Sequence, residues 1–325
     1  FYMFNAIKVT AMFIGAIVGA GFATGREVIL YFGAYGYLTP VISGLMMGAV
    51  SAVFLAAGKY AQAGGIWGAF NKLVDFFVFA SMVITFAVMC SALEELSMAC
   101  FAVPLVGLSG GIICGILSCF DIKFIKNISS VLVAVLIACA AVLYFLCTKM
   151  HAGDIDAVSA FEYCGMNMLT GGCLIKDEGK SMSGRQIALC SALNGGIAAL
   201  LLGLVYTVAC CNSSSSMPVF VFAAGRGLSV LGGALIIAAV LSTLLGAGRV
   251  AFVYLSGYFT SPVLPVLFLC LLSVLGFTLN FSAAVDVFYP FIGYFGVAVC
   301  VITAFSLAAA SRRKLLSARR VKRRT

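Results

Sequence analysis

The sequence is dominated by continuous apolar runs of about 20 residues that contain few charged side chains. A helix of that length crosses the hydrocarbon core of a bilayer, because each residue adds about 1.5 Å along the axis. Of the 325 residues, 63% are hydrophobic and 10% are charged, and the mean hydropathy is +1.16. A soluble domain has about 25% charged residues. Strands of a membrane barrel would alternate apolar and polar residues, so we predict an all-α polytopic membrane protein.

We predict about ten transmembrane helices in one domain over residues 1–311, followed by a basic tail at 312–325. The first run lacks the charged start and cleavage site of a secretory signal, so we expect it to remain as a span. The predicted spans cover about 4–35, 39–58, 73–97, 104–120, 125–148, 157–175, 186–211, 217–247, 261–280 and 286–311.

Basic residues orient these spans, because connections rich in lysine and arginine stay in the cytoplasm. The tail carries many of them, and an even number of spans places both termini on its side. Most basic residues of the predicted connections then also face the cytoplasm, whereas Lys149 and Arg226 face outside. We therefore predict a bacterial cytoplasmic membrane protein with both termini inside. The net charge of +9 favours contact of the tail with anionic lipid headgroups over binding of nucleic acid.

Glycines interrupt two of the predicted spans. Four of them fall between Gly15 and Gly25 in the first span, and others fall between Gly165 and Gly172 in the sixth. Each glycine costs a helix about 1 kcal/mol relative to alanine. A division into two sets of five spans, at about 4–148 and 157–311, makes each interrupted span the first of its set. Broken helices at matching positions are typical of transporters built from inverted repeats.

Small residues have a second use, which is to let helices pack closely through GxxxG patterns. We expect packing at Gly44 and Gly48 and at Gly107, Gly111 and Gly115, and a true break at residues 19–25. The thirteen cysteines are scattered through apolar runs, and we interpret them as packing residues.

Among the charged residues within predicted spans, we single out Arg26, Glu27 and Glu162. Such charges are costly in lipid and are usually functional. One interpretation is a structural ion pair that fixes the first helix. The other is a gate, a proton site or a contact with solute. Candidate partners elsewhere in the chain are Glu94, Glu95, Glu162 and Asp286.

Three segments of the sequence carry a resemblance to a known family. Val18–Glu27 and Tyr289–Gly296 are close to two of its motifs, and Tyr163 and Asn167 match a tyrosine and an asparagine in its sixth span. The chain thereby resembles the YkvI-like family of bacterial membrane proteins. That family is similar to the amino acid–polyamine–cation transporters, so the resemblance implies the LeuT-type fold of five plus five helices with helices 1 and 6 broken.

This resemblance implies a solute site between the two breaks. Free N–H groups after the first break favour an anionic group of the solute, such as a carboxylate. The residues expected to form the substrate-binding site are Gly19, Ala20, Gly21, Phe22, Thr24, Gly25, Tyr163 and Asn167.

The resemblance also implies a coupling ion. Ser242 and Thr243 match a hydroxyl pair that, in the wider fold, binds sodium with carbonyls of the first helix, here near Ala16 and Gly19. The alternative for this pair is ordinary hydrogen bonding of each hydroxyl to the preceding turn. If protons couple transport instead, Glu27 is the expected carrier, because an intramembrane carboxylate can titrate.

The leading hypothesis is a secondary transporter of a small polar solute, such as an amino acid, driven by Na⁺ or H⁺ through alternating access. The second is a membrane protein of the same fold that senses a ligand without transporting it. An enzyme is the poorest hypothesis, because the sequence has no histidine cluster, paired aspartate motif or nucleophile elbow. We expect no cofactor apart from the coupling ion, membrane lipids and the solute as partners, and no binding of nucleic acid.

Overall fold

The computed structural model describes residues 2–60, 66–147 and 153–322, and within these ranges it contains helices and no strand. This agrees with the all-α class predicted from the sequence. Lys149 and the last three residues, which contributed to the predicted orientation, lie outside the described residues. The elements are α1 (Tyr2–Ile17), α2 (Ala20–Thr24), α3 (Arg26–Phe32), α4 (Leu38–Tyr60), α5 (Ile66–Phe101), α6 (Val106–Leu117), α7 (Ile122–Phe145), α8 (Ala157–Asn167), η1 (Met168–Gly172), α9 (Cys173–Lys176), η2 (Asp177–Ser181), α10 (Gly184–Ala209), η3 (Cys210–Asn212), α11 (Pro218–Gly225), α12 (Ser229–Ser256), α13 (Val263–Gly276) and α14 (Phe281–Lys322).

Six helices of the described residues are long and apolar enough to cross a membrane, and they lie in α4, α5, α7, α10, α12 and α14. The chain is therefore an all-helical membrane protein with several apolar spans. Four further spans predicted from the sequence correspond to shorter pieces. α6 and α13 have 12 and 14 residues. The first and sixth predicted spans are each divided among several short elements. The count of about ten remains a prediction.

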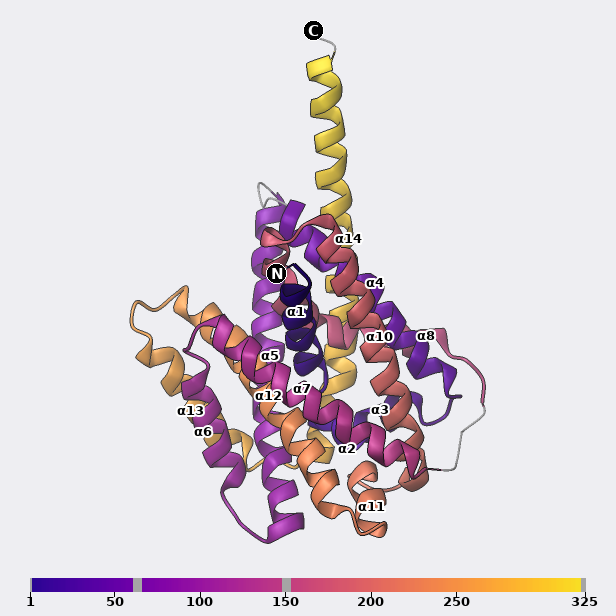
Figure 1. Cartoon of the computed structure of the whole chain (residues 1–325). Helices are drawn as coiled ribbons and strands as arrows, with labels where there is room; N and C mark the ends of the chain where they lie inside the picture. The colour runs from indigo at the N-terminus through magenta and orange to yellow at the C-terminus, as the bar shows by residue number, and fades with distance from the viewer. Residues whose placement is uncertain (1, 61–65, 148–152, 323–325) are drawn as a thin grey trace.

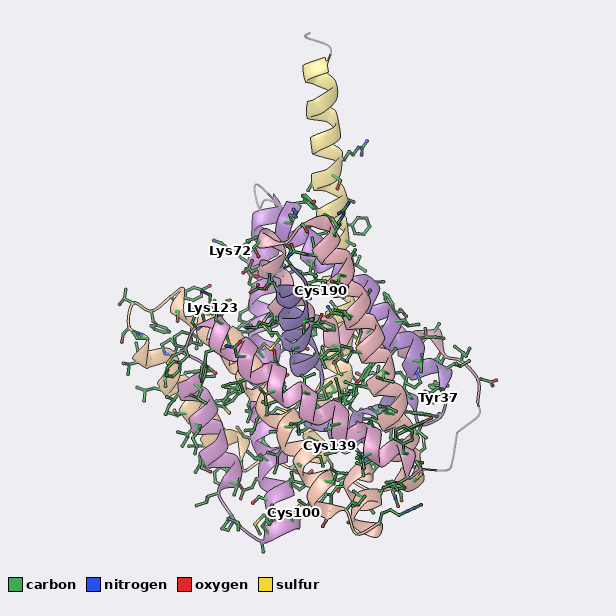
Figure 2. The ribbon with its side chains drawn as sticks, in the orientation of Figure 1. Tyr37, Lys72, Cys100, Lys123, Cys139 and Cys190 are labelled. Carbon is green, nitrogen blue, oxygen red and sulfur yellow. The ribbon has the colours of Figure 1, made fainter. Side chains whose placement is uncertain are left out.

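The two ends of the chain lie toward one end of the helix bundle (Figure 1). α1 begins in the half from which the basic end of α14 projects, and α11 lies at the opposite end. α14 is one helix of 42 residues that continues the last apolar span into the tail. Figure 2 places Lys72 and Lys123 toward the tail end and Cys100 toward the other. This distribution of lysines is the one expected if the tail end faces the cytoplasm.

The first predicted span is interrupted, as its glycines indicated. α1 ends at Ile17, the two-residue gap before α2 contains Val18 and Gly19, and Gly25 separates α2 from α3. Gly25 has φ of 81°, a left-handed conformation that costs a residue with a side chain strain. A Cβ at this position would also lie 2.6 Å from the Cβ of Ala209. The turn between α2 and α3 therefore requires glycine.

The predicted break in the sixth span is wrong in its geometry. α8 runs directly into the π-helical turn η1 and then into α9, so the helical path is continuous from Ala157 to Lys176. A π turn accommodates an extra residue while each N–H still finds a helical carbonyl partner. Gly171 and Gly172 allow this turn to pack tightly, because a Cβ at Gly171 would lie 2.6 Å from Ile17 and one at Gly172 would lie 2.3 Å from Met168.

The predicted boundaries of the eighth span, 217–247, are also wrong. The segment divides into the short helix α11 and the long helix α12, with Gly227 at a φ of 73° between them. α11 ends at Gly225, and the turn that follows contains Arg226 and Gly227. α12 therefore spans Ser229–Ser256, which places Ser242 and Thr243 at its middle rather than near its end.

α4 and α10 pack backbone against backbone. A Cβ on Gly44 would lie 2.3 Å from the backbone N of Ala199, and one on Gly48 would lie 2.6 Å from the Cα of Gly195. This is the close packing that the sequence predicted for Gly44 and Gly48. Small residues allow such an approach, which maximises van der Waals contact between helices that lipid does not drive together.

The α4–α10 contact yields a stability prediction. Gly195→Leu should lower the midpoint of thermal unfolding by about 2–6 °C, because overpacking costs about 1–3 kcal/mol and the atoms that a side chain would meet here belong to the backbone. Gly196→Leu is the matched control, since a Cβ there meets nothing within 4 Å. Scanning fluorimetry of both variants in detergent checks the prediction. Equal midpoints for the two variants would contradict it.

Candidate functional site

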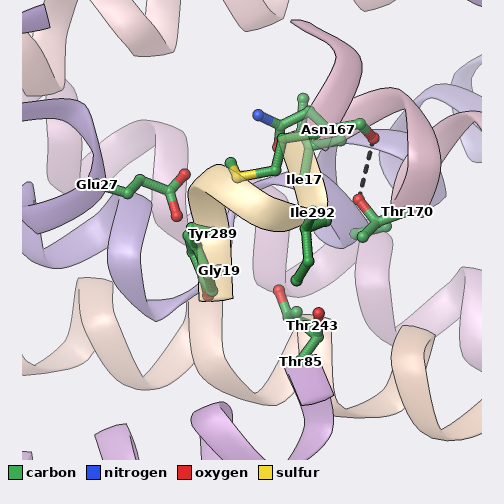
Figure 3. A pocket seen from close by; sticks show the side chains of 11 residues that line it. Ile17, Gly19, Glu27, Thr85, Asn167, Thr170, Thr243, Tyr289 and Ile292 are labelled. Atoms are coloured by element: carbon green, nitrogen blue, oxygen red, sulfur yellow. Dashed lines mark hydrogen bonds between the residues drawn. The ribbon is translucent and has the colours of Figure 1, made fainter. Parts of the chain in front are cut away.

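A small cavity lies at the interruption of the first helix. Its volume is about 30 Å³, which is room for one or two molecules the size of water. Figure 3 shows the cavity, with Glu27 on one side and Asn167 and Thr170 on the opposite side. The residues that line it come from α1 to α3, α5, α8, η1, α12 and α14, and they are Ala16, Ile17, Gly19, Glu27, Thr85, Met166, Asn167, Thr170, Thr243, Tyr289 and Ile292. We call this space the deep cavity.

Thr243 joins the middle of α12 to the end of α1. Its hydroxyl oxygen lies 3.1 Å from the carbonyl oxygen of Gly15 and 3.2 Å from that of Val18. The last carbonyls of a helix have no partner within that helix, so the interruption leaves these groups available to another element. The close approach needs a small residue on α1, because a Cβ at Gly15 would lie 3.3 Å from the Cβ of Ser242.

Ser242 behaves as the ordinary interpretation expected, since its hydroxyl donates to the carbonyl of Ala239 in the preceding turn at 2.9 Å. The carbonyls in contact with Thr243 belong to Gly15 near the end of α1 and to Val18 in the gap that follows, next to the predicted positions near Ala16 and Gly19. Ala16 and Gly19 line the deep cavity instead. The arrangement gathers neutral oxygens from two helices, a ligand type that hard cations prefer.

Glu27 is enclosed beside the deep cavity with 2% of its surface exposed. The hydroxyl of Tyr163 donates to its Oε1 at 2.5 Å. Its Oε2 lies against Gly21, where a Cβ would come within 2.5 Å of this oxygen. Tyr163 and Gly21, both predicted to contact solute, thus hold the carboxylate, and neither of them lines the cavity.

The remaining predicted binding residues divide into two groups. Gly19 and Asn167 line the deep cavity, and the Asn167 amide donates to the carbonyl of Tyr163 at 3.0 Å. Ala20, Phe22, Thr24 and Gly25 are buried outside its lining. The N–H of Ala20 donates to the sulfur of Met89 at 3.2 Å, and the Thr24 hydroxyl donates to the carbonyl of Gly21 at 3.2 Å.

Arg26 finds its partner in Asp286, one of the four candidates from the sequence. Nη2 lies 2.5 Å from Oδ2 and Nε lies 3.2 Å from Oδ1, so the pair is bidentate. It joins α3 to the start of α14, at the end of that helix farthest from the tail. Glu162 lies half-buried on α8, and its side chain comes within 3.1 Å of a Cβ position at Gly293.

A second, larger cavity of about 650 Å³ lies toward the tail end, among α4, α5, α9, α12 and α14. Leu174 lines this larger cavity. A Cβ at Gly246, one turn after Thr243, would lie 3.7 Å from Leu174 and 3.8 Å from Ala16. Leu174 of the larger cavity and Ala16 of the deep cavity therefore border the same position on α12.

Several residues of the site were not identified from the sequence. Thr85 and Ile292 line the deep cavity; Thr85 stands in an apolar run without a local signal that separates it from a packing residue, whereas Ile292 lies in the segment Tyr289–Gly296 that carried the family resemblance. Met89 provides the sulfur that accepts from Ala20. Tyr289 also lines the cavity, and it belongs to one of the segments that carried the family resemblance.

Comparison with known proteins finds a distant relative. Over 238 residues the chain is 24% identical to the uncharacterized protein YyaD of Bacillus subtilis (strain 168), an alignment that covers 66% of this chain and 68% of that protein. No family model matches the chain.

Proposed function

We propose that the chain is a secondary transporter of a small polar solute, driven by Na⁺ or H⁺ through alternating access. The observation that carries this proposal is the contact of Thr243 with the Gly15 and Val18 carbonyls at the interruption of the first helix. Thr243 also lines the deep cavity with Glu27, so an ion and a solute bound there would interact directly. An ion that holds α1 against α12 favours solute binding, and the coupling is reciprocal.

The proposed architecture is the LeuT-type repeat of five plus five spans, in a member of the YkvI-like family. Helices at equivalent positions of the two halves contact each other: α1 with η1, α4 with α10, and α5 with α12. Pairing of equivalent helices is what a two-fold relation between the halves would produce. The proposal includes no catalytic role and no cofactor apart from the coupling ion.

The positions of the charges and cavities support alternating access. The Arg26–Asp286 pair lies at the end of α14 farthest from the tail, and the larger cavity lies on the tail side of the deep cavity. A solute path would therefore be closed by the ion pair on one side and by Leu174 on the other.

We place the protein in a bacterial cytoplasmic membrane with both termini in the cytoplasm and its basic tail on anionic lipid. Reporter fusions after Thr325 and within residues 150–156 should report opposite sides of the membrane. Two fusions on the same side would refute this topology.

Transport is tested with the full chain in proteoliposomes. A mixture of radiolabelled amino acids should accumulate under an inward Na⁺ or H⁺ gradient, and should not accumulate in protein-free liposomes. Stabilisation of the protein by a solute without concentrative uptake would identify a ligand-sensing protein instead.

A further inference from the structure

We propose that the deep cavity binds the ammonium group of an amine-bearing solute, with Glu27 as its counter-charge. The role of the ammonium group in transport rests on the proposed function, whereas its binding to the deep cavity does not. Glu27 is the one charged residue among the described residues that line the cavity. When this carboxylate is ionised, the site carries a negative charge, which selects a cation and disfavours an anion.

A carboxylate enclosed in this way is costly unless a cation or several donors accompany it. Tyr163 supplies a single hydrogen bond to Oε1, and no described basic side chain lines the cavity. Arg26, its neighbour in sequence, is bound to Asp286. A cation from solution would supply the missing charge.

Two hydroxyl groups of the deep cavity are also positioned to accept hydrogen bonds from a ligand. The hydroxyl hydrogen of Thr170 is donated to the carbonyl of Asn167 at 3.0 Å, and that of Thr243 to carbonyls of α1. Each of these two hydroxyl oxygens therefore has only its lone pairs left, and can accept a hydrogen bond from a ligand. An ammonium group carries three donors and no acceptor, so it is complementary to such a lining.

We propose a cationic group of the solute at the position where the sequence led us to expect an anionic group after the break. The N–H of Ala20, the first donor of α2, is engaged by the sulfur of Met89. The carboxylate of Glu27 lies directly against Gly21 in the same short helix. An anion at this position would meet a negative charge rather than free donors.

The cavity volume of about 30 Å³ fits a headgroup rather than a whole amino acid, so the probes should be small. The full chain in detergent is titrated with methylammonium chloride, acetamide and potassium acetate, at an ionic strength matched with KCl. Methylammonium should raise the midpoint of thermal unfolding in a saturable way, whereas acetamide and acetate should leave it unchanged. Stabilisation by acetate alone, or by none of the three, would overturn the proposal.

Variants at three positions test whether methylammonium binds at Glu27. Glu27→Gln should weaken the apparent affinity for methylammonium by about tenfold or more, because it removes a charge-assisted contact. Tyr163→Phe keeps the ring and the charge of Glu27, and should keep the preference for methylammonium over acetate. Glu162→Gln is the matched control, since Glu162 lies outside the lining of the cavity, and its affinity should equal that of the wild type.

The results of the binding and uptake experiments can refute the amine site and the transport function separately. Methylammonium binding that depends on Glu27, without uptake of any amino acid, leaves the amine site in place and refutes transport. Uptake of a solute without an amine, unaffected by Glu27→Gln, refutes the amine site and leaves transport in place. If Glu27→Gln does not fold, an unsaturable response of the wild type to methylammonium decides against the site.

Discussion

Thr243→Ala should abolish the dependence of solute binding on sodium. We expect no effect of sodium up to about tenfold the concentration that gives half-maximal binding in the wild type, which corresponds to the loss of one contact with a charged group. The Thr243 hydroxyl lies within 3.2 Å of two carbonyls of α1, so it occupies the point where both helices could share an ion. The measurement is a titration of solute affinity with Na⁺ at constant ionic strength.

Thr207→Ala is the control for this prediction, and Thr243→Ser tests whether a hydroxyl at position 243 is sufficient. Thr207 is also buried, but its hydroxyl donates to the Gly203 carbonyl within its own helix at 2.8 Å. Thr207→Ala should therefore retain sodium dependence, and Thr243→Ser should restore it. If sodium dependence survives in Thr243→Ala, the cation site is wrong. If affinity depends on pH instead and Glu27→Gln removes that dependence, protons are the coupling ion.

Local chemistry explains which parts of this site could be predicted. The interruption of the first helix could be predicted from its glycines, because glycine tolerates the positive φ that Gly25 adopts. The glycines of the sixth span signal the same weakness, but whether it becomes a gap or a π turn depends on packing against Ile17 and Met168. Sequence alone does not contain that packing.

The other features of the site depend on tertiary contacts, which the sequence does not show directly. The carbonyls that face Thr243 belong to Gly15 and Val18, next to the expected positions near Ala16 and Gly19, and this choice depends on how α12 packs against the first helix. The end of α11 was missed although Gly225 and Gly227 are a turn signal, because the surrounding residues are apolar. Arg26 had four possible partners, and its actual one lies 260 residues away.

The ion pair of Arg26 with Asp286 is expected to act as a gate. Arg26→Ala should lower solute uptake by about tenfold while changing the midpoint of unfolding by less than about 2 °C. The two side chains are 26% and 38% exposed, and an ion pair this accessible to solvent contributes about 1 kcal/mol or less to stability. Its loss therefore affects how α3 and α14 close over the site more than whether the protein folds.

Charge reversal distinguishes a gate from a structural link between helices. The double variant Arg26→Asp/Asp286→Arg should recover part of the uptake lost in either single variant, because the attraction is restored with its sign exchanged. Lys180→Ala is the matched control, since Lys180 pairs with Asp177 at 2.6 Å on the surface and is 66% exposed. That variant should transport as the wild type does. A fall in unfolding midpoint that parallels the loss of uptake in Arg26→Ala would show that the pair fixes the first helix and does not gate the path.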